Sequence, residues 1–431
     1  MTYMWRETVN MPKFEKLKGD HETEVMIIGG GITGVLCAHM LRHSGRDCML
    51  VEAERIGCGT TGGTTAVVTA QHGAVYEKLI RKFGSEAARD YLEANLEAIG
   101  SYAELAERYD FDFSYRDSYI YSLNDSSKLE AEAEAVRSLG FPAEYVKDVR
   151  LPLKTAGAVR FPGMADINPL KLIAELSKDL EIYEHTRIEK VENGTAYFED
   201  GSVKAGKIIV ASHFPFINTR GLYPLKLYQK RSFVIALENA PKLDGNYADI
   251  GERGIYMRNY GNLLAVGGGD HRTGGGSDGF ETVRRFIREH FPDAQERYAW
   301  AAQDCMSLDN VPYIGRYSRT LPDVYVASGF NEWGMTSAMA AARILSSCIE
   351  GHETGYEYVF DPARGLMNRQ ALVNAVHSIA GLLSPGAKRC PHLGCSLKKN
   401  ECEDTWDCPC HGSRFDADGK IIDGPSVRRL E

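Results

Sequence analysis

Two short Cys/His motifs near the C-terminal end constrain this chain more than any other feature. The first reads Cys390-Pro-His-Leu-Gly-Cys395 and the second reads Cys408-Pro-Cys-His-Gly-Ser413. Each motif offers thiolate and imidazole ligands at short spacing. Together they could hold a two-iron cluster with thiolates on one iron and imidazoles on the other. A zinc site is the alternative, although a zinc ribbon would be expected to use Cys-x-x-Cys pairs rather than Cys-x-His.

Composition narrows the class of protein. Five of the ten cysteines lie between residues 390 and 410, and the others are scattered, as in proteins of a reducing compartment. The net charge of −9 gives no broad electrostatic basis for binding nucleic acid. The first twenty residues lack the apolar core of a signal peptide, and no apolar run reaches the ~18 residues that span a bilayer. We therefore expect a cytoplasmic protein with no membrane span and no nucleic-acid partner.

A glycine-rich turn near the N-terminus predicts a dinucleotide-binding site. An apolar run that reads as a buried strand precedes Gly29, Gly31 and Gly34, and a helical pattern follows them. A second apolar strand over 48–51 ends at Glu52, which would accept hydrogen bonds from a ribose. The turn would let a pyrophosphate approach the helix N-terminus. A glycine-rich turn of unrelated purpose is the alternative.

The rest of the chain reads as alternating helices and strands. We expect strands over 24–29, 181–211, 223–267 and 323–328, and helices over 76–110, 127–139, 281–292 and 333–350. The glycine-rich stretch 267–276 is expected to be a flexible loop. Residues 351–385 are expected to form a linker with one helical segment, because Ser-Pro-Gly at 384–386 marks a boundary.

Three separated stretches resemble the FAD-dependent amine and amino-acid oxidoreductases, the group of D-amino-acid oxidase, glycine oxidase and sarcosine oxidase. They are the loop 57–66, the strand 208–212 and the segment 309–336. The resemblance implies FAD as the cofactor, and no second strand-linked Gly-x-Gly-x-x-Gly indicates a separate NAD(P)H site. The cofactor-binding residues that it implies are Gly29, Gly31, Gly34, Glu52, Thr60, Thr61, Thr65, Ala211, Gly329, Gly334, Met335 and Thr336.

The C-terminal stretch 390–425 resembles Rieske [2Fe-2S] domains. The resemblance implies Cys390 and Cys408 as ligands of one iron, His392 and His411 as ligands of the other, and a disulfide between Cys395 and Cys410. Ser413 occupies the position of a serine that, in high-potential members, donates a hydrogen bond to a bridging sulfide. Phe415 occupies the position where those members often have a tyrosine that donates to a cysteine sulfur. Because such hydrogen bonds raise the reduction potential, we expect a potential below that of respiratory-chain Rieske centres.

The two resemblances imply an α/β FAD-binding Rossmann-like domain with an interleaved α+β substrate domain, followed by a small all-β Rieske domain. The expected FAD-binding domain is discontinuous, over 21–75, 151–215 and 300–350. The expected substrate domain covers 76–150 and 216–299, the linker 351–385 and the Rieske domain 386–431. This Rieske domain is short, because little sequence lies between Ser384 and Cys390.

Four residues are candidates for the catalytic site. In amino-acid oxidases of the family, an arginine shortly before the Asp-x-x-Pro segment pairs with the substrate carboxylate, and the aligned position here is Asp304. An acidic group there would repel a carboxylate and attract a cation, which favours an amine-type substrate. A strand-end or capping role for Asp304 is the alternative. Tyr256, Arg258 and His271 are further candidates for lining the flavin pocket, or are ordinary sheet and loop residues.

The combined prediction is an FAD-dependent oxidoreductase, more specifically a dehydrogenase acting on a C–N bond. It would oxidise an amine or amino-acid-like substrate by hydride transfer to flavin, and would pass electrons singly through a Rieske cluster to an external acceptor. The expected partners are a small-molecule amine and a one-electron acceptor or donor protein. Two alternatives stay open: a redox sensor or electron-transfer protein, and a reductase in which electrons run from cluster to flavin to substrate.

Overall fold

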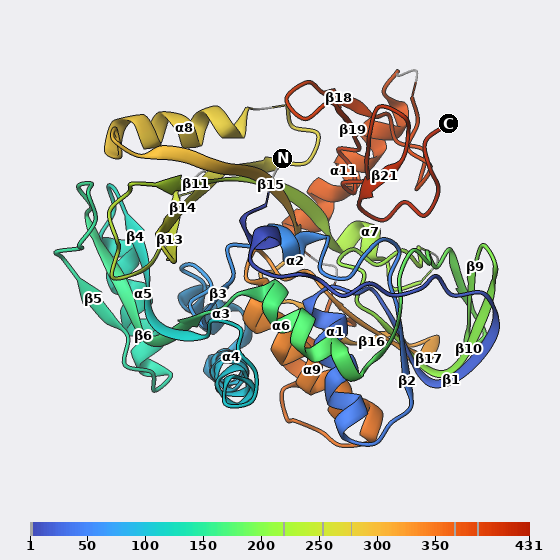
Figure 1. The fold of residues 1–431 in the computed structure, drawn as a ribbon. Helices are drawn as coiled ribbons and strands as arrows, with labels where there is room; N and C mark the ends of the chain where they lie inside the picture. The colour runs from blue at the N-terminus through green and yellow to red at the C-terminus, as the bar shows by residue number, and fades with distance from the viewer. Residues whose placement is uncertain (1–2, 219, 252–253, 277, 366–367, 386–387) are drawn as a thin grey trace.

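Three β-sheets organise the chain. The computed structural model describes residues 3–218, 220–251, 254–276, 278–365, 368–385 and 388–431. In Figure 1 an eight-stranded sheet lies at the lower right, a nine-stranded sheet lies at the left, and a small C-terminal sheet lies at the upper right. The two large sheets are interleaved along the chain, because each takes strands from both halves of the sequence.

The eight-stranded sheet is built around the strands that flank the glycine turn. β1 (Gly19–Ile28) pairs in parallel with β2 (Cys48–Val51) and with β10 (Gly201–Val210). The full order is β16 (Tyr313–Ser318), β17 (Leu321–Ser328), β10, β1, β2 and β7 (Glu181–Tyr183), and β8 (Lys190–Glu192) with β9 (Thr195–Phe198) forms a hairpin beside β10. Residues 25–28 are all buried, as an apolar run in a parallel sheet covered on both faces requires.

The nine-stranded sheet is antiparallel except for one pair. Its order is β15 (Gln295–Met306), β11 (Tyr228–Glu238), β14 (Leu263–Arg272), β13 (Tyr256–Tyr260), β12 (Gly245–Asp249), β4 (Ser114–Ser122), β6 (Gly157–Asp166) and β3 (Val67–Val68), and β5 (Glu144–Val146) pairs with β6. The parallel pair is β12 with β4, which come from distant parts of the chain. β11 lies between β14 and β15 and pairs with both, so that side chains from these three neighbouring strands lie next to one another on the same face of the sheet.

The helices pack on these sheets. They are η1 (Met4–Glu7), α1 (Ile32–His43), α2 (Thr60–Gly63), α3 (Tyr76–Phe83), α4 (Ser85–Ala106), α5 (Ser127–Ser138), α6 (Pro169–Leu176), η2 (Ser177–Asp179), α7 (Tyr223–Lys226), α8 (Gly279–His290), α9 (Gly334–Glu350), α10 (Glu357–Phe360) and α11 (Arg369–Leu383). α1 packs against α9, whose buried alanines at 340–342 allow the two helices to approach closely. Asn168, Asp278 and Asn368 cap α6, α8 and α11 by accepting hydrogen bonds from backbone N–H groups.

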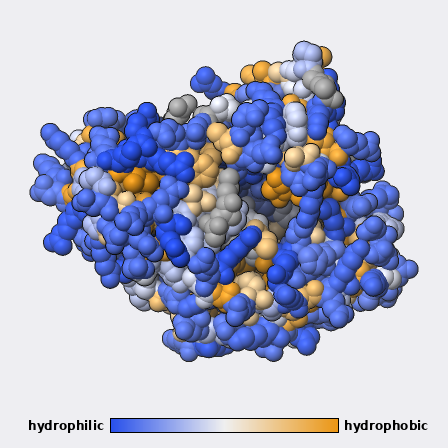
Figure 2. All heavy atoms as spheres, turned by 45° about the horizontal axis from the view of Figure 1, so that its top comes forward, coloured by the Kyte–Doolittle hydropathy of each residue, from blue (hydrophilic) through white to orange (hydrophobic). Residues whose placement is uncertain are grey.

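The C-terminal domain contains an antiparallel sheet of four short strands. They are β18 (Lys398–Asn400), β19 (Thr405–Asp407), β20 (Arg414–Phe415) and β21 (Ile421–Asp423). α11 lies beside this sheet (Figure 1). Figure 2 shows that hydrophilic side chains cover most of the face turned to the viewer, with hydrophobic residues in separated patches.

The prediction of a flexible loop over 267–276 is wrong for its first half, because β14 continues to Arg272. The glycines serve packing within the strand. A Cβ at Gly267 would lie 2.0 Å from the ring of Tyr256, and a Cβ at Gly269 would lie 2.6 Å from the carbonyl oxygen of Gly279. The expected helix over 76–110 is two helices, because Gly84 adopts a φ of +87° between α3 and α4.

Candidate flavin site and iron–sulfur centre

Glu52 fixes the backbone of the glycine turn through hydrogen bonds. The Glu52 carboxylate accepts hydrogen bonds from the backbone N–H groups of Gly30 at 2.7 Å and Glu54 at 2.8 Å. Burial raises the pKa of Glu52 above its ordinary value, and the two N–H donors oppose that rise. The side chain therefore stands fixed at the end of β2, beside the N-terminus of α1, where a ribose and a pyrophosphate would bind.

The spacing of the glycines is required by the close approach of three backbone segments. Gly29 has a φ of +114°, and a Cβ there would lie 2.6 Å from the carbonyl oxygen of Ala211. A Cβ at Gly34 would lie 1.9 Å from the carbonyl oxygen of Gly29. The first glycine thus brings β1 against the end of β10, and the last lets α1 start directly behind the turn.

A cavity of about 480 Å³ begins at this turn and is lined by residues of both large sheets. The predicted cofactor residues that line it are Gly29, Gly31, Glu52, Thr60, Thr61, Thr65, Ala211, Gly329, Gly334 and Met335. Gly34 packs behind the turn, and the Thr336 hydroxyl donates to the carbonyl oxygen of Thr69 at 2.9 Å. The residues present fit FAD, because the glycine backbone suits a pyrophosphate, Glu52 suits a ribose, and the cavity continues to the nine-stranded sheet.

The candidate catalytic residues have different positions. Tyr256, Arg258 and Asp304 line the cavity. Arg258 is committed to structure, because its guanidinium donates to the carbonyl oxygen of Ala66 at 2.8 Å and pairs with Asp166 at 3.8 Å. His271 is not among the lining residues.

A cluster of three carboxylates, Asp270, Asp304 and Glu332, lies on the sheet side of the cavity, and only Asp304 was predicted from the sequence. Lys230 pairs with Glu332 at 2.8 Å and approaches Asp270 at 4.0 Å, and it lies opposite Asp304 across the β11–β15 pair. The Ser232 hydroxyl donates to Asp304 at 3.5 Å. Asp270 Oδ1 is buried and has no hydrogen-bond partner among the described residues. Three carboxylates and one lysine thus lie together at the wall of the cavity.

The alternation of β14 explains why Asp270 was missed. Adjacent strand residues point to opposite faces of a sheet, so the cavity receives Asp270 and the opposite face receives its neighbour His271. The His271 ring stacks on Phe233 at a centroid distance of 5.4 Å. The signal in the sequence was an acidic residue beside three glycines, where the strand carries little side-chain bulk of its own.

Burial dominates the electrostatics of this carboxylate group. Burial and the neighbouring Glu332 raise the pKa of Asp304 to about 7. The same two causes raise the pKa of Asp270 well above its ordinary value. Burial opposes the charge on Lys230, but Glu332 and Asp270 raise its pKa above its ordinary value and keep it protonated. The group therefore holds acidic protons near neutral pH, and a bound cation would displace them.

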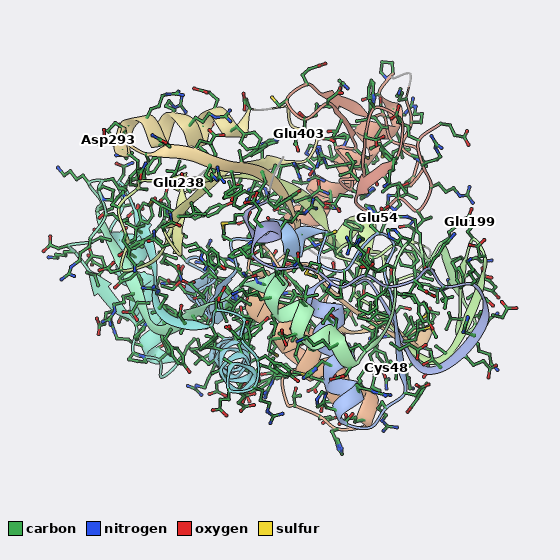
Figure 3. All side chains as sticks on the ribbon, viewed as in Figure 1. Cys48, Glu54, Glu199, Glu238, Asp293 and Glu403 are labelled. Carbon is green, nitrogen blue, oxygen red and sulfur yellow. The ribbon has the colours of Figure 1, made fainter. Side chains whose placement is uncertain are left out.

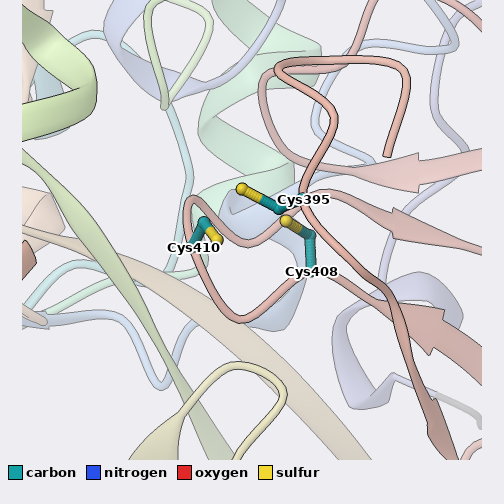
Figure 4. Close-up of side chains that lie close together, drawn as sticks. All are labelled: Cys395, Cys408 and Cys410. Atoms are coloured by element: carbon teal, nitrogen blue, oxygen red, sulfur yellow. The ribbon is translucent and has the colours of Figure 1, made fainter. Parts of the chain in front are cut away.

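The two Cys/His motifs form adjacent loops in the C-terminal domain. Cys395, Cys408 and Cys410 point toward one another, and their Sγ atoms lie within 4.8 Å (Figure 4). Cys390 lies in the same buried cluster. The first loop is closed by a hydrogen bond from Cys390 N–H to the carbonyl oxygen of Cys395 at 2.8 Å, and the second by one from Cys408 N–H to that of Ser413 at 2.8 Å.

His392 and His411 lie side by side between the two loops, and each has one ring nitrogen without a hydrogen-bond partner among the described residues. The rings of His392 and His411 lie 5.0 Å apart, and both Nδ1 atoms are buried without a hydrogen-bond partner in the described part of the chain. Their Nε2 atoms are engaged, by Asn218 Oδ1 at 2.6 Å and by Ser378 Oγ at 3.4 Å. Burial lowers the pKa of His392 to about 3 and that of His411 to about 4, so both rings are neutral. Neutral imidazoles with unpartnered Nδ1 atoms fit a cluster that Cys390 and Cys408 would complete.

The predicted disulfide between Cys395 and Cys410 is wrong for this structure. All ten cysteines are free, and the Sγ atoms of Cys395 and Cys410 share their space with that of Cys408 instead of lying at the ~2.05 Å of a disulfide. The two sulfurs also face α11, where Cys410 Sγ lies 3.6 Å from the carbonyl oxygen of His377.

Phe415 gives a direct test of how the cluster potential is set. Its ring is fully buried in the cysteine cluster and carries no donor, whereas a tyrosine would bring a hydroxyl to the sulfurs. We expect Phe415→Tyr to raise the reduction potential, because a hydrogen bond to sulfur stabilises the reduced cluster. A redox titration followed by electron paramagnetic resonance (EPR) measures this, with Phe286→Tyr on α8 as the control. An unchanged or lower potential would contradict the assignment.

One loop separates the flavin cavity from the cluster site. Residues 211–214 follow β10 and line the cavity. The ring of Phe214 in this loop lies 6.4 Å from the ring of His392 and 6.1 Å from that of His411. Residues 421–427 of the C-terminal domain also line the cavity. The histidine side of the cluster site therefore faces the flavin cavity.

Hydrogen bonds from three neighbouring strands fix the C-terminal domain in this position. Gln229 on β11 donates to the carbonyl oxygen of His411 at 3.0 Å, and Gln303 on β15 donates to that of Gly412 at 2.9 Å. Arg272 on β14 donates to the carbonyl oxygen of Cys410 at 3.1 Å. The second ligand loop is therefore bound to the nine-stranded sheet through its backbone.

A buried ion cluster completes this interface. Arg231 on β11 pairs with Glu403, which also pairs with Arg414 at 2.9 Å, and Arg414 pairs with Asp407 at 3.0 Å. Two positive and two negative charges balance within the cluster, and Glu403 is labelled in Figure 3. Removing one member of such a cluster costs about 3–5 kcal/mol, because an unpaired charge stays buried. The ion cluster thus ties β11 to the C-terminal domain.

Comparisons with known proteins agree with both sites. The family model "FAD dependent oxidoreductase" (DAO) matches residues 24–347, and the model "Rieske [2Fe-2S] domain" matches residues 368–431. The Rieske 2Fe-2S iron-sulfur protein YhfW of Bacillus subtilis is 33% identical over 492 aligned positions, which cover 99% of this chain and 96% of the relative. Because that alignment is longer than the 431-residue chain, the relative carries segments that this chain lacks.

Two more distant matches cover the flavin part. The gamma-glutamylputrescine oxidoreductase of Escherichia coli is 22% identical and covers 78% of this chain and 86% of its own length. The structure of L-proline dehydrogenase from P. horikoshii superimposes with a TM-score of 0.67 at 20% identity, over 80% of this chain and 98% of the other. No helix in the ranges that the structure describes is long and apolar enough to cross a membrane. The chain belongs to the DAO family of FAD-dependent oxidoreductases and carries a C-terminal Rieske [2Fe-2S] domain.

Proposed function

We propose that this enzyme oxidises a cationic amine at FAD and passes the electrons one at a time through the Rieske centre to an external acceptor. The observation that carries this proposal is the shared loop 211–214, which lines the flavin cavity on one side and contacts both cluster histidines on the other. A sensor would not need the carboxylate-lined space beside the cofactor residues.

The chemistry divides between cofactors and protein. The bound ammonium would first release one proton, which the charged carboxylates of the cavity wall can accept. Bound FAD would then accept a hydride, two electrons with one proton, from the carbon next to the amine nitrogen, and the resulting iminium would add water to give a carbonyl compound and ammonium. The protein binds and orients the amine, and Tyr256 and the nine-stranded sheet close one wall of its cavity. Two electrons leave for each amine oxidised, so two turnovers of a one-electron acceptor are needed.

The substrate class follows from the charge of the cavity wall. Asp270, Asp304 and Glu332 outnumber the single neighbouring cation, Lys230, so the wall becomes net negative once Asp270 and Asp304 release their protons, and it then favours an ammonium group over a carboxylate. The Arg258 guanidinium already binds the carbonyl oxygen of Ala66 and pairs with Asp166, so it is not free to bind a substrate carboxylate. The names of two relatives, a gamma-glutamylputrescine oxidoreductase and an L-proline dehydrogenase, support oxidation at a C–N bond.

An anaerobic reduction experiment tests the function. A panel of amines, diamines and amino acids is added to the holoenzyme, and flavin bleaching is followed together with the low-temperature EPR signal of the cluster. A cationic amine that bleaches the flavin and then produces a Rieske-type signal supports the proposal. Reduction of both centres by dithionite, but by no amine, would remove it and favour a sensor or a reductase running from cluster to flavin.

Asp304 makes the binding of that amine pH-dependent. Because its carboxyl has a raised pKa, it is largely protonated below about pH 7 and charged above it, so affinity for a cation should rise as the pH rises through 7. Asp304→Asn should remove that rise and increase KM at least about tenfold, since a hydrogen bond to a charged group contributes about 1.5–3 kcal/mol.

The controls separate Asp304 from its neighbours. Lys230, Asp270 and Glu332 face the same space, so the Asp304→Asn profile is compared with the unchanged enzyme over the same pH range. Asp323→Asn, at a surface residue paired with Lys207, should leave KM unchanged. An unaltered KM in Asp304→Asn would show that Asp304 has only a structural role within β15.

A further inference from the structure

The outer face of α11 carries an apolar stripe that the described residues leave uncovered. Leu372, Val376, Ile379 and Leu383 recur at intervals of four, three and four residues and are 67%, 57%, 57% and 79% exposed. This spacing places them on one side of a helix. Leu382 and Leu393 extend the stripe to the first cluster loop, where Leu382 Cδ2 lies 3.6 Å from the position of a Cβ at Gly394.

Exposed large hydrophobic residues are more concentrated on α11 than on the rest of the described surface. Thirteen large hydrophobic residues are exposed in the described chain, and seven of them belong to α11 and the loop that follows it: Leu372, Val373, Val376, Ile379, Leu382, Leu383 and Leu393. Single exposed hydrophobic residues need no explanation, but a contiguous group marks an interaction site.

The inner face of the same helix lies on the cysteines. Cys410 Sγ is 3.6 Å from the carbonyl oxygen of His377, and Cys395 Sγ is 3.9 Å from that of Ser378. A Cβ at Gly381 would lie 2.5 Å from Cys410 Sγ, so only a glycine allows this approach. The cluster site therefore has two sides. Both histidines lie next to Phe214 of the cavity loop, whereas the cysteine loops, together with His411 Nε2 at Ser378 Oγ, contact α11, whose body is about 10 Å thick.

The charge around this stripe is opposite to that of the whole protein. Residues 362–400 contain six lysines and arginines and no aspartate or glutamate, although the chain has a net charge of −9. Arg369, Lys388, Arg389 and Lys398 form no ion pair with a carboxylate among the residues that the structure places, although Lys388 lies over the Trp406 ring at 4.6 Å and Arg389 donates to the carbonyl oxygens of Leu382 and Ser384. Unpaired cations beside an apolar stripe favour a partner that is acidic around an apolar patch.

We propose that the α11 face, defined as the exposed stripe with these four cations, docks an acidic one-electron carrier protein that exchanges single electrons with the cluster. The inference rests on the proposed electron route through the Rieske centre. One electron leaves the reduced cluster, which becomes oxidised, and reduces the carrier, and no bond is made or broken. A stripe about one helix long fits the small interfaces of transient electron-transfer complexes.

Two other occupants fit less well. A second copy of the chain would bring the same cations together across a two-fold axis, which is repulsive. A membrane surface is usually met by helices with aromatic residues at the interface, and α11 contains none.

The test uses an acidic plant-type [2Fe-2S] ferredoxin as the probe. Its potential lies below that of Rieske centres, so reduced ferredoxin should reduce the oxidised cluster of the holoenzyme, and stopped-flow absorbance gives the second-order rate constant. We expect Ile379→Glu to lower this constant at least tenfold, and Arg369→Glu to lower it severalfold with a weaker dependence on salt. Leu123→Glu and Lys128→Glu change exposed residues that are distant from α11 in the sequence, and they should leave the rate constant unchanged. No amine is needed, so this result does not depend on the substrate assignment.

Three outcomes would overturn the proposal. The first is an unchanged rate constant in both α11 variants while their EPR spectra show an intact cluster. The second is binding of the unaltered protein to phosphatidylglycerol vesicles that Ile379→Glu abolishes without slowing ferredoxin, which would assign the face to a membrane. The third is a dimer in sedimentation analysis that Ile379→Glu dissociates, which would assign it to a second copy.

Discussion

Replacing Gly29 with alanine is expected to yield a folded protein that retains no FAD. The residue has a φ of +114°, and its new Cβ would lie 2.6 Å from the carbonyl oxygen of Ala211. The first effect alone costs about 1–2 kcal/mol in an L-residue. The second cannot be relieved by a rotamer change, because the obstacle is backbone. The turn must move away from β10, and the pyrophosphate loses its place at the N-terminus of α1. The flavin absorbance of the purified protein measures the result.

Gly45→Ala is the matched control, because it separates the backbone conformation from the steric clash. Gly45 follows α1 with a φ of +84°, and nothing lies within 4 Å of the position of its Cβ. This variant should lose a similar amount of stability through its backbone and keep its FAD. Full flavin content in Gly29→Ala would show that the turn does not hold the cofactor. Equal flavin loss in both variants would show that stability alone controls it.

The parts of the structure that depend on local sequence were predictable. The expected helix over 333–350 corresponds closely to α9, and the expected strand over 24–29 covers the buried second half of β1, because an unbroken apolar run and a small-residue helix leave few alternatives. The exposed first half of β1 has no such apolar run and was not predicted. The glycine turn with Glu52 at the end of the next strand also has the expected form, since each glycine answers a steric need within a short segment.

The parts that depend on tertiary pairing were not predictable from one sequence. Asp270 enters the cavity through the register of β14 with β11, and no pattern in the sequence states which face of that strand is inside. The interface residues Gln229, Gln303 and Arg272 lie far from the cluster motifs in sequence and read as ordinary strand residues. The disulfide was inferred from resemblance alone. Whether it forms depends on how the two loops place Cys395 and Cys410, and in this structure both cysteines are free.

Substituting His411 with alanine should remove the Rieske centre and leave the flavin. His411 presents a buried, neutral Nδ1 with no other partner in the described chain, and alanine offers the iron no ligand in its place. The FAD cavity should persist, because the nine-stranded sheet binds the second loop through backbone carbonyl oxygens, including that of residue 411 itself. Iron content and the EPR signal report the cluster, and absorbance reports the flavin.

The same variant separates the two halves of the proposed reaction. An amine should still bleach the flavin of His411→Ala, whereas transfer to a one-electron acceptor should fall by more than about 100-fold, the upper range for losing even an outer-shell partner of a metal ligand. His377→Ala is the control, since its exposed side chain lies on α11 beside the same loop and only its carbonyl oxygen contacts Cys410. Retention of a Rieske-type signal in His411→Ala would place the ligands elsewhere. Undiminished acceptor reduction without the signal would mean that electrons leave the flavin by a route that avoids the cluster.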